Sequence, residues 1–285
     1  MRKMLLTFLL MIFVIYSNAA VQKKATPQKK SNPKPLNGLV VILDPGHGGK
    51  DSGANGSFGD GVAVAEDSHC YDTALRVERL ARSQGAAVYL TVRNPKQPNP
   101  INNDPSEPLP SDGNSLFTLN GQQVKAGNEG ILTRMRYANK ILAEHPSHRV
   151  VFIALHFDET GDKTMQGAHL ITPRQDSTPK LAEFLADSFR QAGRIRTKDG
   201  EEWFPILHSG DKSHGIRHLM VLRGQSDPFH KEYNHVSQKV LLEMGNFNNP
   251  ADVWRIRDPK VRDNYAQAVL AALLKVNKLP AKECR

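Results

Sequence analysis

Short apolar segments alternate with helical segments along this chain, and that order constrains the fold more than any other feature. Gly38 to Leu43 is apolar and rich in β-branched residues, as expected for a strand buried on both faces. Strands that alternate with helices at this spacing are typical of an α/β sheet covered on both faces by helices. The predicted strands are 38–43, 87–92, 150–155, 168–172 and 240–244, and the predicted helices are 66–84, 131–145, 179–192 and 258–276.

The first 36 residues differ from the rest. Arg2 and Lys3 precede an apolar run from Met4 to Tyr16, and Ala19 ends a small-residue cleavage site, so we expect a signal peptide over residues 1–19. The run is short for a membrane span, which needs about 20 apolar residues. An uncleaved anchor is the alternative. Residues 20–36 are predicted to be a basic Pro/Lys-rich linker, and residues 37–285 a single folded domain. We therefore expect an exported protein with no transmembrane span after cleavage.

The positive charge of the chain is concentrated at its start. The formal net charge is +9, yet residues 1–36 hold seven of the 38 basic residues and none of the 29 acidic ones. The rest of the chain has a net charge of only +2, with no basic stripe of the kind that binds nucleic acid, so we expect no nucleic-acid partner. The linker is expected to be solvated; contact with an anionic wall or lipid surface is the alternative.

The chain has two cysteines, Cys70 and Cys284, in no metal-ligand spacing. An exported protein can form a disulfide, but the wide separation of the two cysteines in sequence does not show whether they pair. Two longer stretches interrupt the alternation, and we interpret residues 94–130 and 224–238 as insertions. The first is rich in proline and contains Asn120-Gly121 between strand-forming residues, which predicts a hairpin.

Two histidines follow predicted buried strands. His47 lies in the glycine-rich turn Asp44-Pro45-Gly46-His47-Gly48-Gly49, and His156 ends the strand that begins near Val150. Open α/β sheets bind ligands at the carboxyl ends of their strands. Two histidines brought to one edge of a sheet are a plausible start for a zinc site, which needs a third protein ligand and an open position for water.

Two glutamates complete a candidate site. Glu66 begins the helix after the first strand and is the natural third ligand, although a carboxylate in a first helical turn is also favoured by the helix dipole. Glu243 lies inside an apolar strand, where burial is costly unless the carboxylate is paired or has a task. Beside a zinc-bound water it can transfer the proton during hydrolysis; a buried salt bridge is the alternative.

These stretches together resemble the zinc N-acetylmuramoyl-L-alanine amidases of the Amidase_3 type, from about Leu39 to Leu274. Glu66 falls where this family has its ligand glutamate. The segments that carry the resemblance are Val41–Ala54, which matches the opening motif closely, then Arg134–Asn139, Ala154–Asp158 and Leu242–Asn249.

The resemblance implies a mixed or mostly parallel sheet of the amidase/phosphorylase-hydrolase-like kind. It implies one zinc ion held by His47, Glu66 and His156, and proton transfer by Glu243. The implied substrate is peptidoglycan, cut between N-acetylmuramic acid and L-alanine. The implied location is the periplasm, or otherwise the outside of the cell or its wall. In some relatives an inserted helix plugs the site until a partner withdraws it, so a protein activator is a further candidate partner. The insertions here do not resemble that plug, and we expect them to wall the substrate groove.

The chain also departs from the family pattern. Asp158 stands where the family usually has asparagine, and Ser237-Gln238-Lys239 replaces a Met-Pro pair. We consider Asp158, Arg217 and Arg223 as substrate-binding candidates, the arginines for the carboxylates of the stem peptide. His69, one helical turn after Glu66, is not expected to bind the metal. Two other functions stay open from sequence: an inactive peptidoglycan-binding or regulatory protein of this fold, and a zinc peptidase or deacetylase acting on another wall bond.

Overall fold

The computed structural model describes residues 32–57, 60–109, 118–119, 122–173, 178–224 and 232–280. The predicted signal peptide, most of the linker and Cys284 lie outside these residues, as do parts of both insertions. Cys70 is buried in the first helix. No helix in the described ranges combines the length and the apolar character that a membrane crossing needs.

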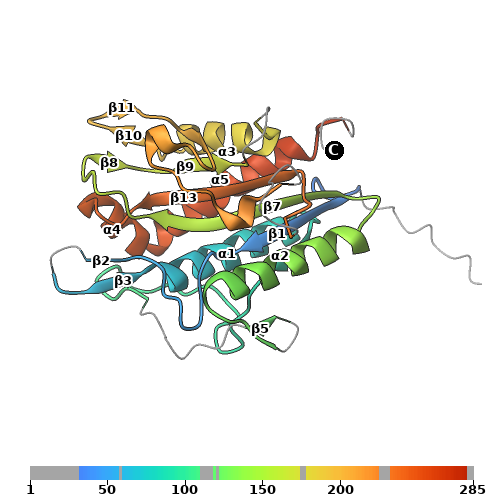
Figure 1. Ribbon diagram of the computed structural model, residues 1–285, viewed down its shortest axis with the longest axis horizontal. Coiled ribbons are helices and arrows are strands. Elements are labelled where there is room, and N and C mark those ends of the chain that lie inside the picture. The colour runs from blue at the N-terminus through green and yellow to red at the C-terminus, as the bar shows by residue number, and fades with distance from the viewer. Residues whose placement is uncertain are drawn as a thin grey trace, which may run out of the picture. The chain divides into compact units, whose positions relative to one another are not determined.

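A six-stranded sheet forms the centre of the domain (Figure 1). In order across the sheet the strands are β12 (Ile206–His208), β9 (His169–Thr172), β13 (Gln238–Asn246), β7 (Arg149–Asp158), β1 (Leu39–Asp44) and β4 (Ala87–Leu90). The four neighbouring strands from β13 to β4 are parallel, β9 runs antiparallel to β13, and β12 is parallel to β9. The sheet is therefore mixed and mostly parallel, as the family resemblance implied.

Helices cover both faces of this sheet, which confirms the prediction from the alternating pattern. All six residues of β1 are buried: Val41 and Leu43 join the larger apolar core, and Val40 and Ile42 join the smaller one on the opposite face. The larger core holds α1 (Glu66–Ser83), α3 (Lys180–Gln191), and α5 (Pro259–Val276), and the smaller holds α2 (Gly127–Glu144) with the short helix η2 (Met220–Leu222).

The parallel register brings polar residues to one edge of the sheet. Asp44 pairs with Ala154, and Glu243 pairs with both His156 on one side and His169 on the other. Side chains at paired positions project from the same face of a sheet. Ala154 and Leu241, two residues before His156 and Glu243, belong to the smaller core. His156 and Glu243 therefore point from the face that α2 covers, just beyond its apolar packing.

Several elements were not predicted. A small sheet of β8 (Met165–Gln166), β10 (Thr197–Lys198) and β11 (Glu201–Glu202) lies within the irregular stretch and the loop before β9. Helix α4 (Pro250–Arg257) also went unpredicted, although Asn249 caps it by accepting hydrogen bonds from the amides of Ala251 and Asp252. Asparagine before a proline at the first helical position is a recognisable start signal. The other short elements are β2 (Asn55–Ser57), β3 (Ala63–Ala65) and η1 (Lys212–His214).

Both ends of the first insertion are fixed in place. The predicted hairpin is present as β5 (Thr118–Leu119) and β6 (Gln122–Gln123), and α2 begins at Gly127, inside the stretch expected to be irregular. Near the other end, the carbonyl of Ile101 accepts hydrogen bonds from the buried guanidinium groups of Arg76 on α1 and Arg262 on α5. Both arginines also donate to the buried carboxylate of Asp72.

Candidate metal centre

Three side chains from different elements converge at the carboxyl end of the parallel strands. One candidate ligand atom from each of His47, Glu66 and His156 lies within 4.8 Å of the other two. Nε2 of His47 is 3.1 Å from one Glu66 oxygen, and Nδ1 of His156 is 3.0 Å from the other. The two imidazole rings meet edge to face, with centroids 4.9 Å apart. Two histidines and a carboxylate are a common donor set for catalytic zinc, so the residues fit that ion.

Glu66 is fixed between the two histidines. Its side chain is only 3% exposed, and its oxygens accept hydrogen bonds from the backbone amides of Ala54, at 2.8 Å, and Phe157, at 3.0 Å. Burial raises the pKa of this carboxyl, but the interactions with His156 and His47 outweigh burial and lower the pKa well below its usual range. Glu66 is therefore ionised, which is the form that binds a cation.

Two glycines allow the loop around His47 to approach this carboxylate. Gly46 has φ of +69°, and a Cβ atom there would lie 2.6 Å from the carbonyl oxygen of Leu155 and 2.7 Å from the ring of His156. Gly53 has φ of +66°, and a Cβ atom there would collide with Glu66 and lie 2.7 Å from the ring of His47. Only glycine fits both the backbone conformation and the space. The loop thus leaves room for the three candidate ligands to converge.

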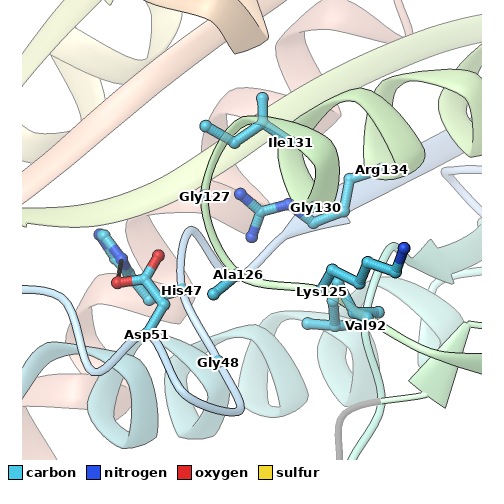
Figure 2. Close-up of a pocket in the computed structure, with 11 residues that line it drawn as sticks. His47, Gly48, Asp51, Val92, Lys125, Ala126, Gly127, Gly130, Ile131 and Arg134 are labelled. Carbon is cyan, nitrogen blue, oxygen red and sulfur yellow. Dashed lines mark ion pairs between the residues drawn. The ribbon is translucent and has the colours of Figure 1, made fainter.

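Asp51 within the loop and Arg134 from α2 fix the conformation of this loop (Figure 2). Nδ1 of His47 lies 3.1 Å from Oδ1 of Asp51, so the other ring nitrogen faces Glu66. Burial lowers the pKa of His47, but the Asp51 and Glu66 carboxylates outweigh it and raise that pKa to about 10. Arg134 extends from α2 toward the loop, donates to the carbonyl of Gly46, and lies 3.4 Å from the buried carboxylate of Asp44. A carboxylate on the second nitrogen of a metal-binding histidine commonly fixes its orientation.

Glu243 lies beside the triad through its pairing with His156. Its Oε2 atom is buried and has no hydrogen-bond partner among the described residues. Burial raises the pKa of Glu243 well above its usual range, and the carboxylates of Asp158 and Glu66 raise it further. A largely buried carboxyl with one partnerless oxygen and a strongly shifted pKa is typical of a group that transfers protons. The alternative of a salt-bridge partner gains no support, because no ion pair to Glu243 is present in the described residues.

Asp158 lies at the end of β7, with Oδ2 3.9 Å from Nε2 of the buried His169. Arg196, which is 8% exposed, interacts electrostatically with Asp158 and Glu243. Neither Asp51 nor Arg196 was predicted from the sequence to be part of the site. Asp51 could have been predicted, because it is a carboxylate four residues after His47 in the same loop. Arg196 lies in an irregular stretch where no sequence pattern indicates its position.

The remaining candidates lie elsewhere. Arg217 is exposed and lies three residues after the end of η1, and Arg223 directly follows η2. Substrate binding by Arg217, Arg223 or Asp158 stays a prediction. His69 is buried with Nδ1 2.7 Å from the carbonyl oxygen of Ala65, and is not among the converging ligands. A pocket beside His47 and Arg134 is lined by residues at the end of the first insertion, namely Val124, Lys125, Ala126, Gly127 and Gly130 (Figure 2).

An α/β domain that gathers two histidines and a carboxylate at its strand ends, with a largely buried glutamate beside them, has the groups that metal-assisted hydrolysis requires. The chain belongs to the N-acetylmuramoyl-L-alanine amidase family, whose model matches residues 41–275. This match covers most of the folded domain and confirms both the family and the reaction class expected from the sequence.

Three relatives illustrate the similarity. The germination-specific N-acetylmuramoyl-L-alanine amidase of Bacillus subtilis is 24% identical over 96% of both chains. A probable cell wall amidase LytH of Staphylococcus epidermidis is 39% identical over 84% of this chain and 58% of its own length. An uncharacterized cell wall amidase of Bacillus anthracis is 25% identical over 87% of this chain but 37% of its own length. The chain thus spans only part of some relatives and nearly all of another.

Solved structures share the fold. The amidase Ami1 from Mycobacterium smegmatis aligns with a TM-score of 0.54 and 19% identity, over 85% of this chain and 99% of that one. The CwlD amidase from Clostridioides difficile, solved in complex with the GerS lipoprotein, aligns with a TM-score of 0.53 and 16% identity, over 83% and 96%. At this identity the comparison establishes the architecture, which agrees with the predicted fold.

Proposed function

We propose that this protein is a zinc-dependent hydrolase that cleaves the amide bond between N-acetylmuramic acid and L-alanine in peptidoglycan. The observation that carries the proposal is the placement of an ionised Glu66 between His47 and His156, with Glu243 adjacent. One zinc ion would be held by the three converging residues. When bound, it would polarise the scissile carbonyl and acidify a water molecule.

The chain's own residues supply the other parts of the reaction. Asp51 orients the imidazole of His47, and the backbone amides of Ala54 and Phe157 fix Glu66. Glu243 takes the proton of the attacking water as the new C–O bond forms. It then donates that proton to the nitrogen of L-alanine as the C–N bond breaks. The products are a free lactyl carboxyl on the sugar and a free amino group on the peptide.

The setting of the reaction is part of the proposal. Relatives are named cell wall amidases, and the start of the chain has the pattern of a signal peptide, so we place the protein outside the cytoplasm, in the periplasm or at the wall. The CwlD structure contains a lipoprotein partner, which supports testing for a protein activator here. Peptidoglycan is the proposed macromolecular substrate.

Product analysis tests the reaction. The purified protein is incubated with peptidoglycan, with zinc or with a chelator, and the newly released ends are identified. Stem peptides that begin with L-alanine, released only with zinc, are the expected result. Other peptide ends or free amino sugars would identify a peptidase or a deacetylase instead. Binding of the wall without release, by a folded and zinc-loaded sample supplied with extracytoplasmic extract as a source of activator, would identify a binding protein and overturn the proposal.

A further inference from the structure

Two aromatic side chains are exposed next to each other on the segment that follows β11. Trp203 is 37% exposed and Phe204 44%, while the described residues include only two other large hydrophobic side chains with such exposure. Their rings meet edge to face at 5.0 Å, and the ring of Phe204 lies 4.2 Å from that of His214. We call Trp203, Phe204 and His214 the aromatic strip. Contiguous exposed aromatic surface is a common mark of a binding site.

The backbone at Phe204 is strained in the conformation that forms this strip. Phe204 has φ of +39°, and Asp199 is the only other non-glycine residue with positive φ in the described ranges. A bulky side chain avoids this region, because its Cβ crowds the backbone. Strained backbone persists where the surroundings hold it and tends to occur at functional sites. Here it places the Phe204 ring between Trp203 and His214.

The strip is connected to the catalytic face through Arg196. The amide of Trp203 donates to the carbonyl of Arg196 at 3.1 Å, next to the β10–β11 pairing of Thr197 with Glu202. Paired positions on neighbouring strands project their side chains to the same face. The Arg196 guanidinium interacts electrostatically with Asp158 and Glu243. Lys198 of β10 is paired with Asp162 in the loop that follows β7, so the strand pair that precedes Trp203 is tied to the segment beyond His156. Figure 1 shows β10 and β11 beside β8, the strand that follows the His156 strand along the chain.

The charges around the strip favour a neutral occupant. Nζ of Lys198 lies 5.2 Å from the centre of the Trp203 ring but is paired with Asp162 at 3.0 Å. Nδ1 of His214 is paired with Asp211 at 2.8 Å. The ammonium group over the Trp203 ring and the imidazole of His214 are therefore each paired with a carboxylate. A stem peptide carries carboxylates that need unpaired cations, whereas the C–H face of a pyranose ring is apolar with slight positive charge, which complements the face of an aromatic ring.

We propose that the aromatic strip is a glycan subsite, on which sugar rings of the peptidoglycan strand stack. The inference rests on the proposed function, which supplies a substrate whose amide bond is attached to a sugar chain. The strip would hold sugars beyond the reacting residue, while Glu243 and the candidate zinc ligands engage the bond that is cut. It would therefore favour long glycan strands over small wall fragments.

Binding and cleavage measurements on the full chain test the strip. The probe is the hexamer of β-1,4-linked N-acetylglucosamine, titrated calorimetrically into the zinc-free protein so that binding is independent of turnover. Trp203→Ala should weaken hexamer binding about tenfold or more, as for a central aromatic contact. Trp254→Ala is the matched control, because Trp254 is 42% exposed on α4 and should bind as wild type does.

Phe204→Gly separates binding from folding. Glycine tolerates the positive φ, so this variant should be at least as thermally stable as wild type, yet it should bind the hexamer several-fold more weakly. In cleavage assays Trp203→Ala should lower kcat/KM on intact peptidoglycan and leave cleavage of a single muramoyl peptide unchanged.

Absence of hexamer binding by wild type, or equal loss in Trp254→Ala, would overturn the proposal. Binding of a synthetic stem peptide that depends on Trp203, with none of the hexamer, would also overturn it and assign the strip to the peptide side. If the hexamer binds as expected but the wall is not cleaved, the proposed reaction is overturned, whereas the assignment of the strip as a sugar-binding surface is supported.

Discussion

Glu243 on β13 and His156 on β7 are direct partners in the parallel register. This pairing places the proposed proton-transfer group beside a candidate metal ligand by means of backbone hydrogen bonds alone. No flexible loop lies between them. The sheet therefore fixes the position of Glu243 relative to His156. Glu243 does not need to bind the metal in order to stay beside it.

Glu243→Gln should stop cleavage without releasing the metal. The amide keeps the shape of the side chain but cannot accept and return the proton, so the rate of stem-peptide release should fall roughly 10²–10⁴-fold. Zinc content, measured by mass spectrometry of the purified protein, should equal that of wild type. A variant that lost its zinc would assign Glu243 to the metal shell instead.

Asp51→Asn should weaken zinc binding while preserving the fold. The carboxylate on Nδ1 of His47 aligns the ring, and loss of such a contact commonly lowers metal affinity about 10–100-fold. Competition with a chromogenic chelator measures the affinity, and circular dichroism checks the fold. Unchanged affinity would mean that the loop glycines and Arg134 are sufficient to orient His47.

Gly53→Ala should destabilise the apo protein and impair the site. The added methyl group would collide with Glu66, and φ of +66° is strained for alanine by about 1–3 kcal/mol. Gly61→Ala is the matched control, since Gly61 has φ of +76° and open space around it. Both variants should lose stability in denaturant titrations, but only Gly53→Ala should lose zinc affinity. Equal zinc affinity in the two would show that Glu66 can move away.

His69 should make the protein acid-sensitive. Burial lowers its pKa to about 3 in the folded state, against an ordinary value of about 6.5 in the unfolded chain. The unfolded chain thus binds the extra proton first, so the contribution of His69 is fully present above pH 6.5. It is lost as pH falls toward 3, by up to roughly 1.4 kcal/mol per pH unit. Urea unfolding of the apo protein at several pH values measures this slope.

His69→Leu should show a shallower loss of stability over the same pH range, because the buried leucine has no proton to bind. The comparison uses the slope rather than the absolute stability, since removing the hydrogen bond to Ala65 also has a cost. An identical slope in the variant would assign the acid sensitivity to other groups.

The spacing of apolar residues was sufficient to predict the main helices and strands, because each of these segments buries one or both of its faces in the core. His47 and His156 were predictable because each directly follows a buried strand, and parallel strands end at a common edge. The position of Glu66 depended on family resemblance, since its first-turn location has an ordinary electrostatic explanation. The position of Arg196 depends on the pairing of two-residue strands in an irregular stretch. Strands this short show no hydrophobic periodicity, so the sequence does not predict them. The strip formed by Trp203 depends on that same pairing.

The arginines that hold Ile101 have a consequence for engineering this enzyme. Arg76 and Arg262 share Asp72 in the core and each donate to backbone or side-chain oxygens of residues 101–103. A shortened chain without residues 94–130 would leave these guanidinium groups in a core lacking those oxygens, where the middle of α1 packs against α5. Residues 101–103 are therefore a structural part of the scaffold, and their removal should destabilise the domain.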